Sequence, residues 1–417
     1  MEMRTAKMPC TPREEGEIIA YLRSPVAIRE RCQQVFDMAL AERSPHFTCN
    51  LSQLERVADY VIEVMHEQYP DLQIPFHSRW RHFEAGGIPR LAQLDGKLAG
   101  LTPTQKAAAK YDLAIISVLL DAGAGDRWQY CEQDTKLVFK RSEGLAVASF
   151  QMFCQGTFAS DRHQPLQVDA QRLQALTEQE LAHGFQANLE NPLVGMIGRL
   201  NLLQQLGQVI LASPQMFGEQ NPHPGNLVNF LLAQVKNNQL AAQTVLSAVL
   251  EGLSDIWPGR IEVAGVNLGD VWYHPAVSDD GLVPFHKLSQ WLTYSLLEPL
   301  QELGVEITDL DALTGLPEYR NGGLCLDLGL IEVKNPNIFS QSHLVSSEII
   351  VEWRALTVIL LDYIAATVRE KLSMSAEELP LVKILQGGTW AAGRKIAAQL
   401  RAGGISPIQI ESDGTVF

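Results

Sequence analysis

The sequence lacks the short motifs that mark common enzyme and metal sites. Its 417 residues contain no GxSxG, HExxH, P-loop or CxxC motif, and its six cysteines are scattered along the chain. This cysteine spacing argues against a disulfide framework and a zinc site, and it is typical of a reduced protein of the cytoplasm. His77 and His82 have no third potential ligand at a recognised spacing. We therefore expect neither a metal ion nor another cofactor.

An excess of positive charge and long apolar runs are also missing. The formal net charge is −15 and the sequence pI is about 5.1, whereas proteins that bind a phosphate backbone usually carry a basic face. The longest apolar run, residues 356–366, is interrupted by Asp362 and falls well short of the roughly 20 residues that cross a membrane. Residues 1–17 contain no apolar segment of the secretory type. We expect a soluble cytoplasmic protein that binds neither nucleic acid nor membranes.

Helical periodicity dominates what the sequence does contain. Apolar residues recur at helical spacing over residues 25–40, with Ser24 as a candidate N-cap and Pro25 in the first turn. The same kind of pattern predicts further helices over residues 51–69, 102–121, 143–155, 169–186, 194–208, 226–231, 240–253, 286–303, 346–371, 377–385 and 390–402.

Signals for strands are few. Residues 136–141 and the alternating leucines of 323–334 are candidate strands, and residues 408–417 resemble a terminal hairpin. The sequence thus predicts a mainly α protein with a minor β component of short hairpins. We expect one large helical domain over residues 1–417, dividing into two lobes at about residue 210 (1–210 and 211–417) with the functional site between them.

Two short motifs place a carboxylate two residues before an arginine. Glu318 and Arg320 lie in the turn LTGLPEYRNGG, and Glu352 and Arg354 lie in the apolar helical segment VEWRALT. A neighbouring cation lowers the pKa of a carboxylate, so we expect these carboxylates to be ionised in sheltered sites. Such a group can stabilise a developing sugar cation or orient a water molecule. A purely structural network of buried ion pairs explains the same residues equally well.

Two further segments combine aromatic, basic and acidic side chains. Residues 75–87 carry Arg79, Arg81 and His82 among aromatic residues, which suits a planar or phosphorylated ligand, although aromatic packing in the core is the commoner explanation. In LLDAGAGDRW, Asp121 and Asp126 flank a glycine-containing loop that ends at Trp128. This build is found in binding loops, and a glycine C-cap with solvated aspartates accounts for it as readily.

Two helix starts carry groups suited to an anion or a sugar. Ser142 and Glu143 open one helix, where an anion can bind or where ordinary capping applies. His286, Lys287 and Gln290 open another, and Lys287 and Gln290 share a face at i, i+3 spacing. These residues could contact a phosphate or a sugar hydroxyl, or they could simply be the solvated start of a helix, and the sequence leaves both interpretations open.

These motifs together resemble a known family. RWRHFEAGG, LLDAGAGDRW, KRSEGLAVASF, PFHKLSQWL, LTGLPEYRNGG and VEWRALT are similar to segments of the fungal and bacterial uracil-catabolism family, and the resemblance extends over residues 24–417. It implies a role in pyrimidine degradation by a route that opens the ring at the nucleotide level. The logic of that route implies a ribosylurea-type intermediate and a step that cleaves an N-ribosyl bond. Other enzymes of the route are the implied protein partners.

A second resemblance points to the queuosine 5′-phosphate N-glycosylase family, which has a helical fold similar to DNA glycosylases. Its aromatic-acidic loop resembles LLDAGAGDRW, its Tyr-Lys-Arg-x-Gln helix start resembles FHKLSQ, and its acidic-x-Arg helix resembles EWR. Its Asp-Tyr-Arg turn, which bears the catalytic carboxylate, resembles Glu318, Tyr319 and Arg320. This chain departs from that pattern, because Glu318 is one methylene longer than aspartate and glycines follow Arg320 where that family has leucine and proline.

The resemblances imply an N-ribosyl hydrolase that releases urea from a ring-opened pyrimidine nucleoside or nucleotide, such as ribosylurea or its 5′-phosphate. The implied catalytic residues are Glu318, Glu352 and Asp121. The implied substrate-binding residues are Arg320, Arg354, Asp126, Trp128, His286, Lys287, Gln290, Arg79, Arg81, His82, Ser142, Glu143 and Tyr319. Two alternatives stay open: an amidohydrolase acting on the ureido group, and a non-catalytic nucleotide-binding partner of the ring-opening enzyme.

Overall fold

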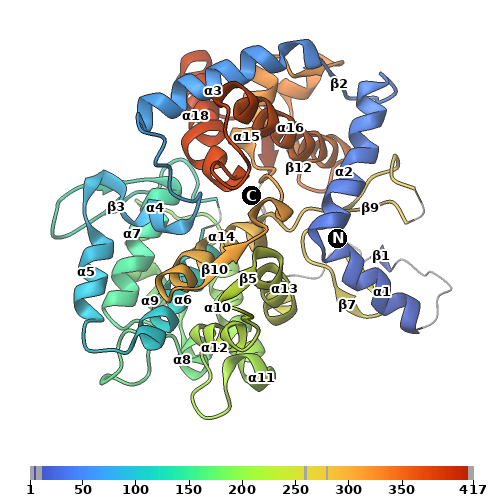
Figure 1. Ribbon diagram of the computed structural model, residues 1–417. Coiled ribbons are helices and arrows are strands. Elements are labelled where there is room, and N and C mark those ends of the chain that lie inside the picture. Colours follow the sequence, from blue (N-terminus) through green and yellow to red (C-terminus); the bar gives the residue numbers. More distant parts are fainter. Residues whose placement is uncertain (1–3, 6–11, 122, 258–260, 279, 412–417) are drawn as a thin grey trace. The chain divides into compact units, whose positions relative to one another are not determined.

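A computed structural model describes residues 4–5, 12–121, 123–257, 261–278 and 280–411 (Figure 1). Within these residues the protein is mainly helical with short strands, so the expected mainly α class with a minor β component is confirmed. The chain forms two compact units, each assembled from separate segments. As far as their residues are described, unit 1 comprises Met1–His77, Gly259–Gln290 and Asp309–Ser412, and unit 2 comprises Ser78–Pro258 and Trp291–Thr308.

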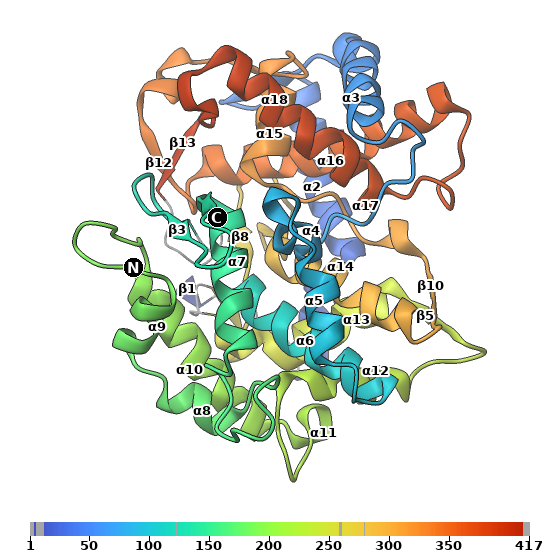
Figure 2. The same ribbon diagram turned by 90° about the vertical axis from the view of Figure 1, so that its left-hand side faces the viewer.

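Helices build most of unit 1. They are α1 (Pro12–Leu22), α2 (Pro25–Leu40), α3 (Leu54–Gln68), α15 (Tyr319–Asp327), α16 (Glu348–Leu372), α17 (Leu381–Ile384), α18 (Trp390–Leu400) and the first residues of α14 (Lys287–Glu302). The long helix α16 contacts α2, α3 and α15, and α15 also contacts α18 (Figures 1 and 2). Ser24 caps α2 through the N–H of Ala27, and Pro25 opens the helix, as the sequence predicts.

The burial of α16 explains its composition. Sixteen of its 25 residues are buried, among them Glu352 and Arg354, because the helix is apolar nearly all round and has packing partners on several sides. None of the described helices combines the length and apolar character needed to cross a bilayer.

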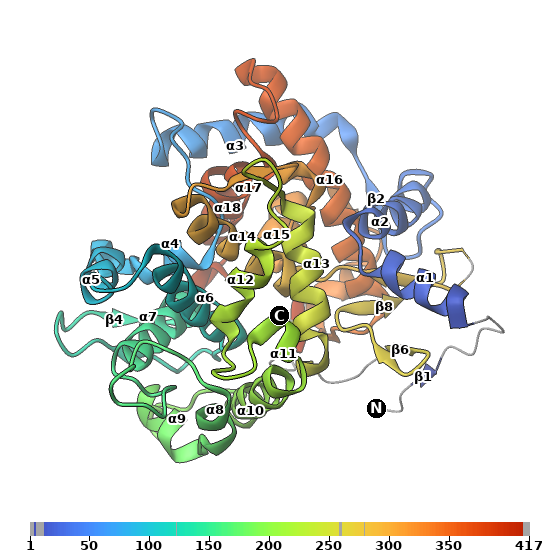
Figure 3. The same cartoon turned by 60° about the horizontal axis from the view of Figure 1, so that its bottom comes forward.

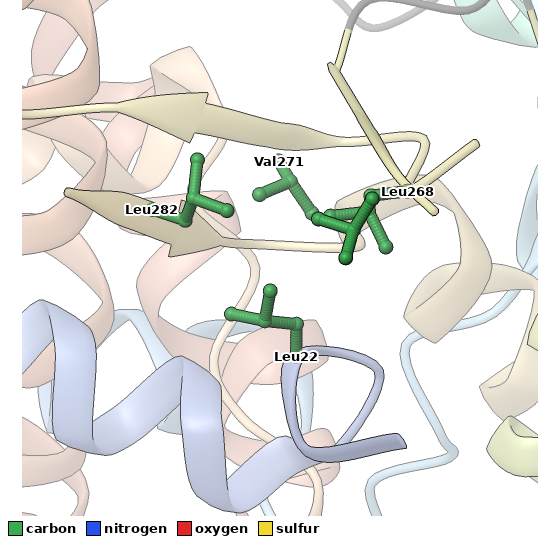
Figure 4. Packing of buried hydrophobic residues seen from close by; sticks show 5 residues of the cluster. Leu22, Leu268, Val271 and Leu282 are labelled. Atoms are coloured by element: carbon green, nitrogen blue, oxygen red, sulfur yellow. The ribbon is translucent and has the colours of Figure 1, made fainter. Parts of the chain in front are cut away.

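The strands of unit 1 are short, and they pair both with neighbouring strands and with distant segments. They are β1 (Arg4–Thr5), β2 (Phe47–Cys49), β6 (Ile261–Val263), β7 (Val266–Asn267), β8 (Val271–Tyr273), β9 (Leu282–Pro284), β11 (Ile331–Val333), β12 (Ser342–Leu344) and β13 (Gln409–Glu411). Their order is β1-β6-β7, β11-β2, β12-β13 and β8-β9. Figure 4 shows how the β8-β9 pair packs on the end of α1, where Leu22 meets Leu268, Val271 and Leu282.

Unit 2 is also built from helices. They are α4 (Arg79–Phe83), α5 (Arg90–Lys97), α6 (Pro103–Leu119), α7 (Arg141–Cys154), α8 (Ala170–Ala175), α9 (Glu178–Gly184), α10 (Met196–Ala212), α11 (Pro214–Phe217), α12 (Leu227–Leu232), α13 (Ala242–Leu253) and the remainder of α14. α6 contacts α7 and α12, and α10 contacts α8, α9 and α13 (Figure 3). The strands pair as β3 (Tyr130–Cys131) with β4 (Val138–Phe139) and as β5 (Gln239–Ala241) with β10 (Glu306–Thr308).

Short helical turns connect these elements. The 3-10 turns are η1 (Leu51–Gln53), η2 (Ala85–Gly87), η3 (Pro224–Asn226), η4 (Ser254–Ile256), η5 (Leu310–Ala312), η6 (Pro336–Ser340) and η8 (Ala402–Gly404). The turn η7 (Leu385–Thr389) is π-helical. Turns of that kind are rare and occur frequently at functional sites.

The structure corrects several sequence-based expectations. The strand predicted over 323–334 is wrong for its first half, which belongs to α15, and only β11 is extended. The helix predicted over 169–186 is two helices, because Thr177 starts a new capping box with Glu180. The helix predicted over 377–385 is shorter than expected, because only α17 (Leu381–Ile384) is α-helical there. The expected hairpin at 408–417 is wrong where it is described, since β13 pairs in parallel with β12. Residues 412–417 lie outside the described residues.

The expectation of short hairpins is confirmed only in part. β3-β4, β6-β7 and β8-β9 are antiparallel pairs of neighbouring strands. β1-β6, β5-β10 and β12-β13 are parallel pairs, and β2-β11 joins segments far apart in the sequence. Periodicity within one segment carries no signal for a partner strand so distant in the chain.

Candidate functional site

The Glu318 side chain caps the helix that follows it. Glu318 is the N-cap residue of α15, with an extended backbone at φ −108° and ψ 165°. Its Oε2 accepts the N–H of Arg320 at 2.7 Å, and its Oε1 accepts the N–H of Asn321 at 2.6 Å. The residue is only 9% exposed. Two backbone donors therefore hold a buried carboxylate in one orientation, and each oxygen retains a second lone pair.

Burial raises the pKa of Glu318. This loss of hydration is the largest effect, and it outweighs the backbone hydrogen bonds and the charges of Lys287 and Arg320, which lower the pKa. The Arg320 guanidinium is directed elsewhere: Nη1 donates to the Gly404 carbonyl at 2.6 Å, and the group lies 4.8 Å from the centre of the Tyr319 ring. The sequence predicted a lowered pKa for this carboxylate, and that direction is wrong because burial dominates.

The start of α14 brings a lysine near this carboxylate. The Lys287 ammonium lowers the pKa of both Glu318 and His77, and its backbone N–H donates to Asp270 Oδ2 at 3.0 Å. The preceding residue, His286, has a left-handed backbone with φ 47°. Such a conformation costs a residue other than glycine about 1–3 kcal/mol and is concentrated at functional sites. Lys287, the first residue of α14, therefore directly follows a strained residue.

The imidazole of His286 anchors this turn as a neutral group. Its Nε2 lies 2.8 Å from the Leu22 carbonyl oxygen, so Nε2 carries the hydrogen and donates it. Burial lowers the pKa of His286, which favours the uncharged ring. In this arrangement Lys287, and not His286, supplies positive charge.

The side-chain amide of Gln290 also forms its hydrogen bonds within unit 1. Its Nε2 donates to the Phe285 carbonyl and to Thr314 Oγ1, and its Oε1 accepts the N–H of Thr314 at 2.9 Å. The side chain is fully buried. Gln290 therefore ties the start of α14 to the segment that leads to Glu318.

Arg354 pairs with a carboxylate that the sequence did not indicate. Arg354 Nη1 and Nη2 contact Asp270 Oδ1 and Oδ2, each at 2.8 Å, and the guanidinium lies 4.1 Å from the centre of the Phe285 ring. Burial alone would raise the pKa of Asp270, but Arg354 outweighs it and the pKa is lowered. Because Asp270 also accepts the N–H of Lys287, this ion pair connects α16 to the start of α14.

Glu352 points away from Arg354. Residues two apart on an α-helix project about 200° apart, so they meet different neighbours. Ser44 Oγ donates a short hydrogen bond to Glu352 Oε1, and His274 Nε2 lies 3.8 Å from Glu352 Oε2. In neither motif do the glutamate and the arginine form an ion pair with each other. Each of these side chains instead has a partner elsewhere in unit 1 or in the backbone.

His77 lies beside the π-helical turn η7. Its Nδ1 is 2.9 Å from Gln386 Oε1 within that turn, and its ring centre is 5.7 Å from that of Trp390. Burial lowers the pKa of His77 to about 4, so the ring is neutral at pH 7. Gln386, Trp390 and Asp270 were missed in the sequence, since their partners lie far away in the chain. The glycine pair in LQGGTW is the one local signal for the irregular turn.

Unit 2 holds a second buried group of the expected site residues. Arg79 Nη1 contacts Asp121 Oδ2 at 2.8 Å, and Arg79 Nε donates to Ser117 Oγ at 2.7 Å. Ser142 Oγ donates to Asp121 Oδ1 at 2.6 Å. Burial lowers the pKa of Arg79, and the charge of Asp121 opposes this effect. Three helices, α4, α6 and α7, thus converge on one buried ion pair.

The other expected residues of unit 2 have varied surroundings. Trp128 is fully buried and donates its indole N–H to the Phe185 carbonyl at 3.0 Å, so it packs in the core. Asp126 is exposed, and Glu143 lies in the first turn of α7. Arg81 Nη2 contacts Glu298 Oε2 at 2.8 Å, and the His82 ring lies edge-on to Trp291 with centres 5.5 Å apart.

The expected residues therefore fall into two sets. Unit 1 contains Glu318, Tyr319, Arg320, Glu352, Arg354, His286, Lys287 and Gln290. Unit 2 contains Arg79, Arg81, His82, Asp121, Asp126, Trp128, Ser142 and Glu143. Within unit 1, the contacts of Asp270 and the charge of Lys287 connect the start of α14, the start of α15 and the second turn of α16.

Comparisons with known proteins extend over nearly the whole chain. A family described as "Protein of unknown function (DUF1688)" matches residues 21–417. The protein urg3 of Schizosaccharomyces pombe is 42% identical over 411 residues, which cover 96% of this chain and 99% of that protein. Uracil catabolism protein 4 of Lachancea kluyveri is 38% identical over 437 residues, with the same coverage of 96% and 99%. The expected relation to uracil-catabolism proteins is confirmed.

Proposed function

Because this chain belongs to the DUF1688 family and is similar over nearly its whole length to uracil catabolism protein 4, we propose that it acts in uracil catabolism as an N-ribosyl hydrolase. The proposed substrate is ribosylurea or its 5′-phosphate. Water adds to C1′, the C1′–N bond breaks, and urea leaves with a proton on its nitrogen. The products are urea and ribose or ribose 5-phosphate. A helical architecture of the DNA-glycosylase type belongs to the same proposal, through the resemblance to the queuosine 5′-phosphate N-glycosylases.

The observation that supports this proposal most is the setting of Glu318. N-glycosidic cleavage, like glycoside hydrolysis, passes through an oxocarbenium-like transition state with positive charge at C1′. A carboxylate that backbone N–H groups hold rigidly needs no reorganisation to stabilise this charge. Glu318 has this form, since Arg320 and Asn321 fix its two oxygens at the start of α15. We assign Glu318 the role of facing C1′ and of orienting the water.

The positive charge at the start of α14 suits the other end of the substrate. The Lys287 ammonium acts on Glu318 electrostatically, and the neighbouring His286 is neutral. A lysine is a strong point charge for a phosphate group. We assign Lys287 to the 5′-phosphate. Asp270 and Arg354 position Lys287 through its backbone N–H.

The test is an assay of products with the purified full chain. Ribosylurea and ribosylurea 5′-phosphate are each incubated with the protein, and urea, ribose products and ammonia are measured separately. The proposal requires urea and the ribose product in equal amounts, without ammonia. Ammonia together with an N-ribosyl product would identify a ureido amidohydrolase, and binding without turnover would identify a nucleotide-binding partner.

Variants of Glu318 separate catalysis from helix capping. Glu318→Gln removes the charge and is expected to lower kcat by about 10²–10³-fold. Glu318→Asp keeps two carboxylate oxygens at the N-cap position, where aspartate is also favoured, so its melting temperature should stay close to that of the parent. Glu332→Gln, an exposed glutamate on β11, serves as the matched control. Full activity in Glu318→Gln would remove Glu318 from the proposed role.

A further inference from the structure

Three potential metal ligands meet where α16 begins. His46 precedes β2, and Glu348 and Glu352 lie one turn apart on the same face of α16. One ligand atom from each residue lies within 4.8 Å of the others. His46 Nε2 and Glu348 Oε1 are 3.5 Å apart. Two ligand atoms bound to one tetrahedral ion at about 2.1 Å are about 3.4 Å apart, so this pair already has the required spacing.

Glu352 offers an oxygen with no hydrogen-bond partner among the described residues. Its side chain is fully buried, and Oε2 accepts no hydrogen bond from the part of the chain that the structure describes, whereas Oε1 accepts the hydroxyl of Ser44. A buried carboxylate oxygen left unpaired is destabilising, because it has lost its hydration without gaining a partner. A cation bound at Oε2 offsets that cost.

The surroundings of the cluster are built to orient its members. Ser44 Oγ accepts the N–H groups of His46 and Phe47, each at 3.1 Å, while its hydroxyl donates to Glu352. One serine thus fixes both the backbone of the histidine and the carboxylate of the glutamate. Partners of this kind, which orient the residues that bind a metal, are a regular part of metal sites.

His274 is a neighbour of the cluster with a different role. Its Nδ1 accepts the N–H of Ala276 at 3.2 Å, so in the neutral ring the hydrogen is on Nε2. That Nε2 is buried without a hydrogen-bond partner among the described residues and lies 3.8 Å from Glu352 Oε2. With its hydrogen there, Nε2 is a donor toward the carboxylate and not a metal ligand. The competing explanation of the buried Glu352 is therefore a loose ion pair with a protonated His274.

We propose that His46, Glu348 and Glu352 bind a divalent first-row transition metal ion. An imidazole suits zinc, iron, copper and nickel, whereas calcium and magnesium take oxygen ligands. Carboxylates also suit manganese, and two of them balance the charge of a divalent ion. His46 and Glu348 side chains are 24% and 40% exposed, so the ion can enter from solvent. Three protein ligands leave a position for water, as in catalytic rather than structural zinc sites. Spacing along the sequence does not indicate this site, because His46 lies far from α16 in the chain.

The test uses the purified full chain after removal of metals with a chelator. Zn²⁺, Mn²⁺, Mg²⁺ and Ca²⁺ are titrated separately, with binding followed by calorimetry and by the melting temperature. The proposal requires one equivalent of Zn²⁺ or Mn²⁺ to bind and to raise the melting temperature. No binding of either ion at micromolar concentration, or a preference for Mg²⁺ or Ca²⁺, would overturn it.

Variants of the two partly exposed ligands locate the ion without disturbing the core. His46→Ala and Glu348→Gln should each weaken binding by more than Ser44→Ala, for which a loss of about 10–100-fold is expected. His66→Ala, an exposed histidine on α3, should bind the ion like the parent chain. If His46→Ala and Glu348→Gln bind as tightly as His66→Ala, the ion is held elsewhere and the ion pair with His274 is the better account of Glu352.

Discussion

Arg354 and Asp270 form a two-point ion pair, with Nη1–Oδ1 and Nη2–Oδ2 both at 2.8 Å. Arg354 is 1% exposed and the Asp270 side chain is 13% exposed. The pair joins the second turn of α16 to the loop before β8, and Asp270 in turn accepts the backbone N–H of Lys287. Its position makes it a link between the fold of unit 1 and the proposed phosphate-binding lysine.

Breaking this pair from either side should destabilise the protein strongly. Asp270→Asn or Arg354→Met leaves the other group buried without its counter-charge, which costs about 3–5 kcal/mol. The double variant should lose clearly less than the sum, because it leaves no unpaired charge. Denaturant unfolding of the four proteins gives the coupling energy. Additive losses would show that the two side chains contribute independently.

The pH dependence of the proposed activity should reflect the burial of Glu318. Its pKa is raised above 4.5, and the carboxylate must be ionised to stabilise the positive C1′. Activity should therefore fall as the pH decreases through an apparent pKa above 4.5. Lys287 lowers this pKa, so Lys287→Met should move the acidic limb to higher pH, while Lys395→Met on α18 should leave it in place. An acidic limb below 4.5 would contradict the assignment.

Lys287 should distinguish a phosphorylated substrate from an unphosphorylated one. A hydrogen bond to a charged group contributes about 1.5–3 kcal/mol, so Lys287→Met should reduce kcat/KM for ribosylurea 5′-phosphate by about 10–150-fold. The value for ribosylurea should change much less at a pH well above the acidic limb. Equal losses on both substrates would show that the lysine does not recognise the phosphate.

Acid should destabilise unit 2 through Glu132. Arg90 Nε and Nη2 contact Glu132 Oε1 and Oε2 at 2.8 and 2.6 Å, and this is the largest cause that lowers the pKa of Glu132 to about 2. A lowered pKa means stability that is complete above pH 4.5 and is lost as the pH falls toward 2. The free energy of unfolding, measured by denaturant over this range, should decrease by roughly 3 kcal/mol from this group. In Glu132→Gln the free energy of unfolding should no longer show this decrease between pH 4.5 and 2, and it should be lower than that of the parent chain at pH 7.

Local signals in the sequence were reliable where the interactions that decide a structure are themselves local. Ser24 and Pro25 predicted the start of α2, and the hydroxyl of Ser24 accepts the N–H of Ala27 as expected. Residues 323–327 were misjudged because alternating leucines resemble a strand. Glu318 starts a helix there, and Gly322 lets α15 approach the Trp353 indole, where a Cβ would lie 2.8 Å from the ring. That close approach is a tertiary requirement.

The candidate site shows the same division. The sequence indicated the buried helix of residues 346–371 and singled out Glu318, Lys287 and Arg354 by residue type. It considered each glutamate together with the arginine two residues later in the chain. In the structure the partner of Arg354 is Asp270, and the hydrogen-bond partner of Glu352 is Ser44. Spacing along a chain fixes only which side of a helix a residue occupies.

The sequence by itself determined that this protein is mainly helical, where α2 begins, and which family it belongs to, because caps, periodicity and motifs are properties of short segments. Only the tertiary structure decided the partner of each buried charge, the direction of the Glu318 pKa and the meeting of His46 with Glu348 and Glu352. These depend on burial and on contacts between segments far apart in the chain. Burial decides how strong an electrostatic interaction is, and the spacing of residues along the chain does not show which side chains are buried.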